Sequence, residues 1–154
     1  MLAELLLGWI DVAPCRVVSR PSAMHSNASK PYQAQLVAAA GLAGPEAIVT
    51  DDPDEVRGFA TEIGSDAIDC RYAGRDGLTA ALSASRLPDE IADRCVRLAA
   101  TLGLPFAGID LRRTPAGDWV CFEVNAMPGY SFYESHTGQP IAAALVRHLV
   151  GKAD

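Results

Sequence analysis

Hydrophobic and polar residues alternate most regularly in two short segments, 107–112 and 119–125, near the C-terminal end of the chain. Alternation with a period of two predicts β-strands, and the turn sequence Thr-Pro-Ala-Gly-Asp between the segments predicts an antiparallel hairpin. We centre the turn on Pro115–Ala116, so that residue 110 lies opposite residue 121. A register shifted by one residue would move Asp110 to the other face of the hairpin.

Side chains alternate across a strand, so this register assigns each residue of the hairpin to one of two faces. The apolar face holds Ala107, Ile109, Leu111, Val120, Phe122 and Val124. The other face holds Gly108, Asp110, Arg112, Trp119, Cys121, Glu123 and Asn125. On this second face we expect Asp110 to lie diagonal to Glu123, and Gly108 to leave open space opposite Glu123.

Two carboxylates and an amide gathered on one face indicate a site for a hard cation. Asp110 and Glu123 would repel each other and raise the pKa of one another unless a cation neutralised them. Together with Asn125 they offer oxygen ligands of the kind that Mg²⁺ prefers. The competing interpretation is a solvated sheet face with Arg112 as a salt-bridge partner, and the residue types alone leave both interpretations open.

The rest of the chain predicts helices mixed with short strands. Helices are predicted over 29–41, capped by Ser29, over 52–64, capped by Asp52, over 88–103 and over 139–151. In the third of these, an apolar stripe at helical spacing predicts a core-facing surface, formed by Ile91, Cys95, Leu98 and Leu102.

Strands or extended segments are predicted over 15–21, 46–50 and 65–77. Because helices and strands follow one another without a regular strand–helix–strand order, the predicted class is α+β.

Composition and charge exclude several classes of partner. The formal net charge is −6 and the longest basic cluster is Arg112-Arg113, so we expect no nucleic-acid partner, which would need concentrated positive charge. The four cysteines lack CxxC spacing, which favours reduced cysteines in a cytoplasmic protein. The apolar segment 1–14 is too short to span a bilayer and lacks the positive start of a signal peptide, so we expect no membrane association.

The segment GLPFAGIDLRRTPAGDWVCFEVNAMPGYSFYE, residues 103–134, carries the pattern G-x-D-L followed by E-V-N-x-x-P-G. This pattern resembles the C-terminal core of the ATP-grasp ligases, especially the branch of ribosomal-protein glutamate ligases and glutathione synthetase. The segments 65–77 and 88–103 follow in the family's order, so the resemblance extends over 61–149. It implies a truncated ATP-grasp fold, in which an antiparallel sheet packs against helices.

The resemblance also implies an activity and its site residues. ATP-grasp ligases use ATP and Mg²⁺ (or Mn²⁺) to join a carboxylate to an amine, on a small molecule or a peptide, through an acylphosphate. The family's metal ligands fall on Asp110, Glu123 and Asn125, which thereby also bind the cofactor, with Glu123 bridging two ions. Arg71 falls where the family has an arginine that faces the γ-phosphate and the acylphosphate, so it is expected to bind ATP and to be catalytic.

The chain departs from the family after residue 60, where relatives carry a further stretch that it lacks. That stretch holds two phosphate-binding lysines, a glycine-rich lid and an acidic hinge for adenine, whereas the lysines of this chain are Lys30 and Lys152. Lys30 is expected in a linker helix, and neither lysine is expected to replace those of the family. Residues 1–60 are accordingly interpreted as a remnant of the region before the ATP-grasp domain with its linker helix, and 61–154 as the C-terminal core with its metal-binding hairpin.

Two hypotheses from different classes follow. The first is a carboxylate–amine ligase dependent on Mg²⁺ and ATP, completed by a second copy of the chain or by a partner chain. The second is a non-catalytic remnant or binding module derived from such a ligase. A simple divalent-cation binder that takes no nucleotide is a third, weaker alternative.

Overall fold

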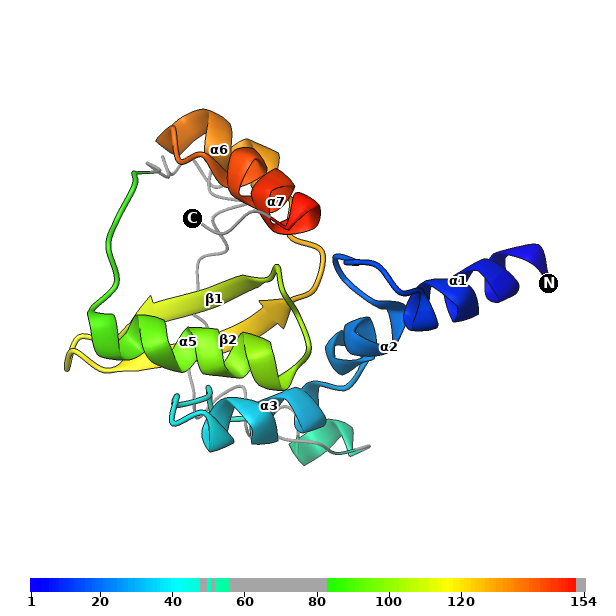
Figure 1. Ribbon diagram of the computed structural model, residues 1–154. Helices are drawn as coiled ribbons and strands as arrows, with labels where there is room; N and C mark the ends of the chain where they lie inside the picture. Colours follow the sequence, from blue (N-terminus) through cyan, green and yellow to red (C-terminus); the bar gives the residue numbers. More distant parts are fainter. Residues whose placement is uncertain (48–49, 51, 56–82, 152–154) are drawn as a thin grey trace. The chain divides into compact units, whose positions relative to one another are not determined.

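The computed structural model describes residues 1–47, 50, 52–55 and 83–151. It divides into two compact units, Met1–Pro45 with Ala84–Asp154, and Glu46–Ser83. The first unit contains, in order, α1 (Leu2–Val12), α2 (Pro21–Met24), η1 (His25–Ala28), α3 (Lys30–Ala39), α5 (Asp89–Thr101), β1 (Gly108–Arg113), β2 (Trp119–Asn125), α6 (Tyr130–Thr137) and α7 (Ile141–Val150) (Figure 1). Helices combined with an antiparallel pair of strands confirm the predicted α+β class. The expected domain boundary at residue 60 stays a prediction.

Capping residues explain where the predicted helices begin and end. The Ser29 hydroxyl accepts a hydrogen bond from the Tyr32 backbone N–H and starts α3, as an N-cap serine does. Gly41 follows that helix with φ +79°, and Gly103 follows α5 with φ +68°, a conformation that glycine adopts without strain. The Asp52 carboxylate accepts from the backbone N–H of Asp54 at 2.8 Å, so the predicted cap of the 52–64 helix is confirmed.

Other expectations were wrong or lie beyond the described residues. The segment 15–21 is not a strand, because α2 begins at Pro21 and residues 15–20 form no regular element. Helices α1 and α6 were not predicted, since neither presents a clear stripe or cap and neither buries a residue. Most of the helix expected over 52–64, the extended segment 65–77 and part of the strand expected over 46–50 lie outside the described residues.

The hairpin register differs from the predicted one through two separate one-residue shifts. Gly117 has φ +99° and the Thr114 N–H donates to Asp118 at 2.8 Å, so the loop is one residue longer than a turn centred on Pro115–Ala116, and Arg113 pairs with Trp119. A bulge between Asp110 and Leu111 then adds the second shift. The result is that Asp110 pairs with Glu123.

The two shifts act differently on the two ends of the hairpin. Beyond the bulge they sum to two residues, so Asp110, Glu123 and Asn125 keep the face predicted for them. Near the loop there is one shift only, and the predicted faces are exchanged in β2, whereas Leu111 of β1 packs against the core as predicted. Cys121, expected on the polar face, is 1% exposed, and Phe122, expected in the core, is 47% exposed.

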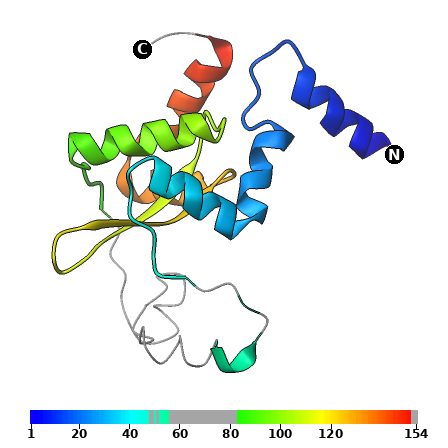
Figure 2. The same cartoon turned by 90° about the horizontal axis from the view of Figure 1, so that it is seen from below.

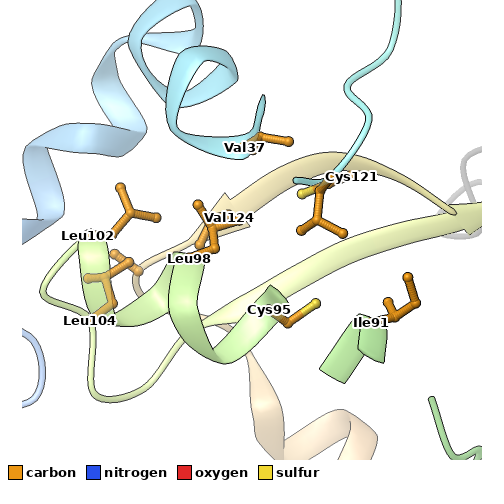
Figure 3. Packing of buried hydrophobic residues seen from close by; sticks show 10 residues of the cluster. Val37, Ile91, Cys95, Leu98, Leu102, Leu104, Cys121 and Val124 are labelled. Carbon is orange, nitrogen blue, oxygen red and sulfur yellow. The ribbon is translucent and has the colours of Figure 1, made fainter. Parts of the chain in front are cut away.

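The core lies between the hairpin, α5 and α3. The predicted stripe of α5 is buried at Ile91, Cys95, Leu98 and Leu102, and Figure 3 shows these side chains directed toward Cys121 and Val124 of β2 and Val37 of α3. Burial in this apolar environment raises the pKa of the Cys121 thiol to about 11 and also raises the pKa of Cys95. These two cysteines are therefore unreactive core residues, as expected for reduced cysteines.

A buried glutamine joins α3 to the outer edge of β2. The Gln33 side chain is 2% exposed; its Nε2 donates to the Val124 carbonyl at 2.9 Å, and its Oε1 accepts from the Val124 N–H at 3.0 Å. Farther along the same edge, the Cys121 N–H donates to the Ala43 carbonyl at 2.8 Å. The Val124 N–H and carbonyl and the Cys121 N–H are thus satisfied by groups from outside the two-stranded sheet.

Helix α1 is held at its C-terminal end. The Arg20 guanidinium donates to the carbonyl groups of Ile10 and Asp11 in the last turn of α1 and to those of Ala13 and Cys15 after it. The Asp11 carboxylate accepts from the N–H and the hydroxyl of Ser22, both at 2.9 Å. These contacts tie α1, the dark blue helix at the N-terminus in Figure 2, to α2. The large apolar side chains of α1 are exposed, among them Leu2, Leu5, Leu6 and Trp9. Within the described residues, no helix is long and apolar enough to cross a membrane.

Replacing Gln33 with alanine tests whether this side chain fixes α3 against β2. The substitution leaves one buried N–H and one buried carbonyl of Val124 without partners, so we expect a loss of about 2–4 kcal/mol in the free energy of unfolding, measured by urea denaturation. Gln35→Ala is the matched control, because Gln35 lies on the same helix and is exposed. Equal effects of the two substitutions would contradict the anchoring role of Gln33.

Candidate metal-binding site

Two carboxylates face each other directly across the hairpin. Asp110 of β1 and Glu123 of β2 are paired residues of the antiparallel ladder; such partners have Cβ atoms about 4.5–5.5 Å apart. This is closer than the diagonal arrangement that the sequence predicts. The Asp110 residue is exposed, and the Glu123 side chain is 37% exposed, so an ion arriving from solvent can reach both carboxylates.

Asn125 forms the end of this face and begins the turn that follows β2. It pairs with Gly108, and its Oδ1 accepts a hydrogen bond from the Met127 N–H at 2.9 Å. This bond fixes the amide while leaving the second lone pair of Oδ1 for another ligand. The open space predicted over Gly108 is absent, because a Cβ at that position would lie 2.8 Å from the Cβ of Pro128. Glycine is needed there to let the turn pack against β1.

A lysine from a distant part of the chain binds the Glu123 carboxylate. The Lys30 Nζ donates to Glu123 Oε1 at 2.8 Å and to Asn27 Oδ1 at 3.1 Å. Sequence analysis placed Lys30 in a linker helix and gave it no part in the site, so it is a residue that sequence reasoning missed. No local signal could have found it, since 93 residues separate Lys30 from Glu123.

The bulge adds an aromatic side chain next to the carboxylates. Phe122 is exposed, and the guanidinium carbon of Arg112 lies 5.7 Å from the centre of its ring, a geometry typical of a cation–π contact. The salt bridge that the structure gives to Glu123 comes from Lys30, whereas the alternative interpretation of the sequence assigned that role to Arg112. Phe122 and Arg112 together border the face that carries the two acids.

The donor atoms of this face fit a hard divalent cation. Two opposed carboxylates supply charge, an amide oxygen supplies a neutral ligand, and Mg²⁺ keeps its remaining positions for water or phosphate. In this conformation the Glu123 carboxylate is paired with the Lys30 ammonium. Among the described residues no three His, Cys, Asp or Glu side chains cluster, so the carboxylates here number two. Arg71, the remaining predicted site residue, lies outside the described residues.

Comparison with known proteins supports the resemblance seen in the sequence. No family model matches the chain. A probable alpha-L-glutamate ligase of Xanthomonas euvesicatoria is 42% identical over 73 residues, which are 47% of this chain and 23% of that protein. The corresponding protein of Serratia proteamaculans is 44% identical over 54 residues, 35% of this chain and 18% of the relative. The matches therefore span less than a quarter of these relatives.

Solved structures decide the fold. The ATP-grasp ligase PsnB, in complex with a minimal precursor, superposes with a TM-score of 0.76 at 21% identity, over 98% of this chain and 71% of PsnB. A RiPP-associated ATP-grasp ligase of Chryseobacterium gregarium, in complex with ADP and a leader and core peptide, gives a TM-score of 0.79 at 15% identity, over 99% of this chain and 68% of that one. The fold is the ATP-grasp fold. The predicted fold is thereby confirmed.

The close packing of Pro128 on Gly108 can be tested in this ATP-grasp hairpin. Gly108→Ala places a Cβ in contact with Pro128, and we expect a loss of about 1–3 kcal/mol in the free energy of unfolding, the usual cost of overpacking. Gly129→Ala is the control, because a Cβ there meets nothing within 4 Å. Chemical denaturation of both variants provides the measurement, and a stable Gly108→Ala variant would show that the turn lifts away from β1.

Proposed function

We propose that the chain is the metal-binding core of a carboxylate–amine ligase that uses Mg²⁺ and ATP and proceeds through an acylphosphate. The observation that carries the proposal is the direct pairing of Asp110 with Glu123 on an accessible hairpin face, in a chain with the ATP-grasp fold. Similarity to proteins described as probable alpha-L-glutamate ligases supports the reaction class. The chain covers only part of these relatives, so its substrate and activity belong to the proposal.

In this proposal Asp110, Glu123 and Asn125 hold the cation, and Glu123 lies between two positions for it. Bound Mg²⁺ would neutralise charge on the β- and γ-phosphates of ATP during phosphoryl transfer. The hairpin contributes a fixed set of oxygens, because both strands, the Asn125–Met127 bond and the Gln33 anchor hold their backbones in place. A PsnB structure contains Mg and ADP, which supports the same pair of ligands here; Mn²⁺ is the alternative cation.

Arg71 completes the proposed site as the group that faces the γ-phosphate and the acylphosphate. Its planar guanidinium suits recognition of a phosphoryl group through two hydrogen bonds. We further propose a peptide as the partner that supplies the carboxylate or the amine, because the structurally similar ligases were solved with precursor or leader and core peptides. A cytoplasmic location accompanies this proposal, since ATP and reduced cysteines are found there.

The alternative function is a non-catalytic module derived from an ATP-grasp ligase, with residues 1–60 as a remnant and 61–154 as the core. The exposed apolar side chains of α1, α6 and α7 favour it, among them Trp9, Phe132, Val146 and Val150. Exposed apolar surface of this kind marks places where another domain, a second copy or a partner chain packs. Under this alternative the hairpin keeps its fold, and nucleotide has no effect on stability.

Thermal melting with and without Mg²⁺ and ATP distinguishes the two functions. With nucleotide at about ten times its Kd, binding raises the melting temperature by roughly 3–6 °C. Glu123→Gln and Asp110→Asn each remove one charge from the site without changing shape, so we expect each to abolish most of the shift.

The control is Asp118→Asn, which removes the same charge from the exposed loop at the far end of the hairpin. It should leave the shift unchanged. A wild-type chain whose melting temperature does not respond to millimolar Mg²⁺ and ATP would rule out the ligase proposal and favour the alternative module.

The role of Arg71 predicts a difference between ATP and ADP. If the Arg71 guanidinium contacts the γ-phosphate, Arg71→Ala should lower the affinity for ATP by about tenfold or more, because a lost charged phosphate contact costs about 1.5–3 kcal/mol. The affinity for ADP should stay as in the wild type. Isothermal titration of both nucleotides with Mg²⁺ measures this ratio. An equal loss of affinity for ATP and ADP would place Arg71 elsewhere in the site or assign it a structural role.

A further inference from the structure

We propose that Lys30 is a built-in counter-ion of Glu123 and competes with the divalent cation for this carboxylate. The inference rests on the proposed function, because it assigns Glu123 to a metal site. It goes beyond that function in naming a residue of α3 as the part of the chain that sets how tightly the free ion binds.

The contacts of Lys30 support a role at Glu123 and not in its own helix. Lys30 is the first residue of α3, where a positive side chain opposes the positive end of the helix dipole. Helix stability therefore gives no reason for a lysine at this position. Its ammonium instead has two acceptors from other elements, Glu123 Oε1 at 2.8 Å and Asn27 Oδ1 at 3.1 Å.

The position of Lys30 is set by a buried contact one turn along α3. Gln33 is bonded at both ends of its amide to Val124, the residue after Glu123. The pairs Gln33–Val124 and Lys30–Glu123 therefore lie side by side, and the buried pair holds α3 at the distance from β2 at which the ammonium reaches the carboxylate. The fold therefore places the Lys30 ammonium next to the Glu123 carboxylate.

The ion pair is accessible enough for a metal ion to replace it. The side chains of Lys30 and Glu123 are 58% and 37% exposed, and exposed ion pairs are weak because water screens them. A divalent cation on Glu123 carries twice the charge of an ammonium, but it has to displace Lys30 from Oε1 or bind while that positive charge stays nearby. In either case the free ion binds more weakly than to the same oxygens without Lys30.

Binding of Mn²⁺ alone to the full chain tests this inference. The free-ion signal in electron paramagnetic resonance gives Kd for the wild type, for Lys30→Gln, which removes the charge, and for Lys30→Arg, which keeps it. We expect Lys30→Gln to bind Mn²⁺ about tenfold more tightly than the wild type, and Lys30→Arg to remain within about twofold of it. Arg97→Gln, which removes one positive charge from the exposed surface of α5, should leave Kd unchanged.

Each other outcome overturns the proposal. Equal Kd in the wild type and Lys30→Gln would show that Lys30 does not compete, and weaker binding in Lys30→Gln would show that it assists the metal. Equal tightening in Arg97→Gln would indicate a general effect of net charge. Glu123→Gln tests the metal site separately from the role of Lys30. If Mn²⁺ binding survives in this variant, or is absent from every variant, the proposed metal site is wrong, and the role of Lys30 is wrong with it.

Discussion

The bond between the Gln33 amide and the Val124 backbone is the contact on which the arrangement of the site depends. The sheet has two strands, so β2 has an outer edge, and its buried N–H and carbonyl would lack partners without a side chain of matching shape. Gln33 supplies both partners. The same contact fixes the start of α3, and with it the ammonium of Lys30, next to the hairpin face that carries Asp110 and Glu123.

The sequence predicted the hairpin, the class of the fold and the acidic face, although the assumed register was wrong by two residues. The prediction for Asp110 and Glu123 survived because the longer loop and the bulge each shift the pairing by one, and two shifts restore the original face. The loop conformation depends on φ at Gly117, and the second shift depends on the bulge between Asp110 and Leu111. The alternation of polar and apolar residues reveals neither the loop conformation nor the bulge, so Cys121 and Phe122 were assigned to the wrong faces.

Contacts between distant segments could not be predicted from one sequence. Gln33 and Gln35 are equivalent in a pattern of polar and apolar positions, and only the packed structure shows that the first is buried and the second exposed. Lys30 was interpreted as a linker residue for the same reason, since its partner Glu123 lies 93 residues away. The stripe of α5 was predictable, because a buried apolar surface at helical spacing is a local pattern that packing then preserves.

The described contacts that support the acidic face lie within the unit formed by Met1–Pro45 and Ala84–Asp154. The described contacts that hold Glu123 and Asn125 come from η1, α3, β1, β2 and the turn at Pro128. Under the proposed function, cation binding by this face and nucleotide binding would therefore be separable, and the first could persist where the second is lost. A metal-binding hairpin is expected of the ligase, of a simple cation binder and of a module that retains the core of an ATP-grasp ligase. Because all three share the hairpin, it is the response to the phosphates of ATP that distinguishes the enzyme from the other two.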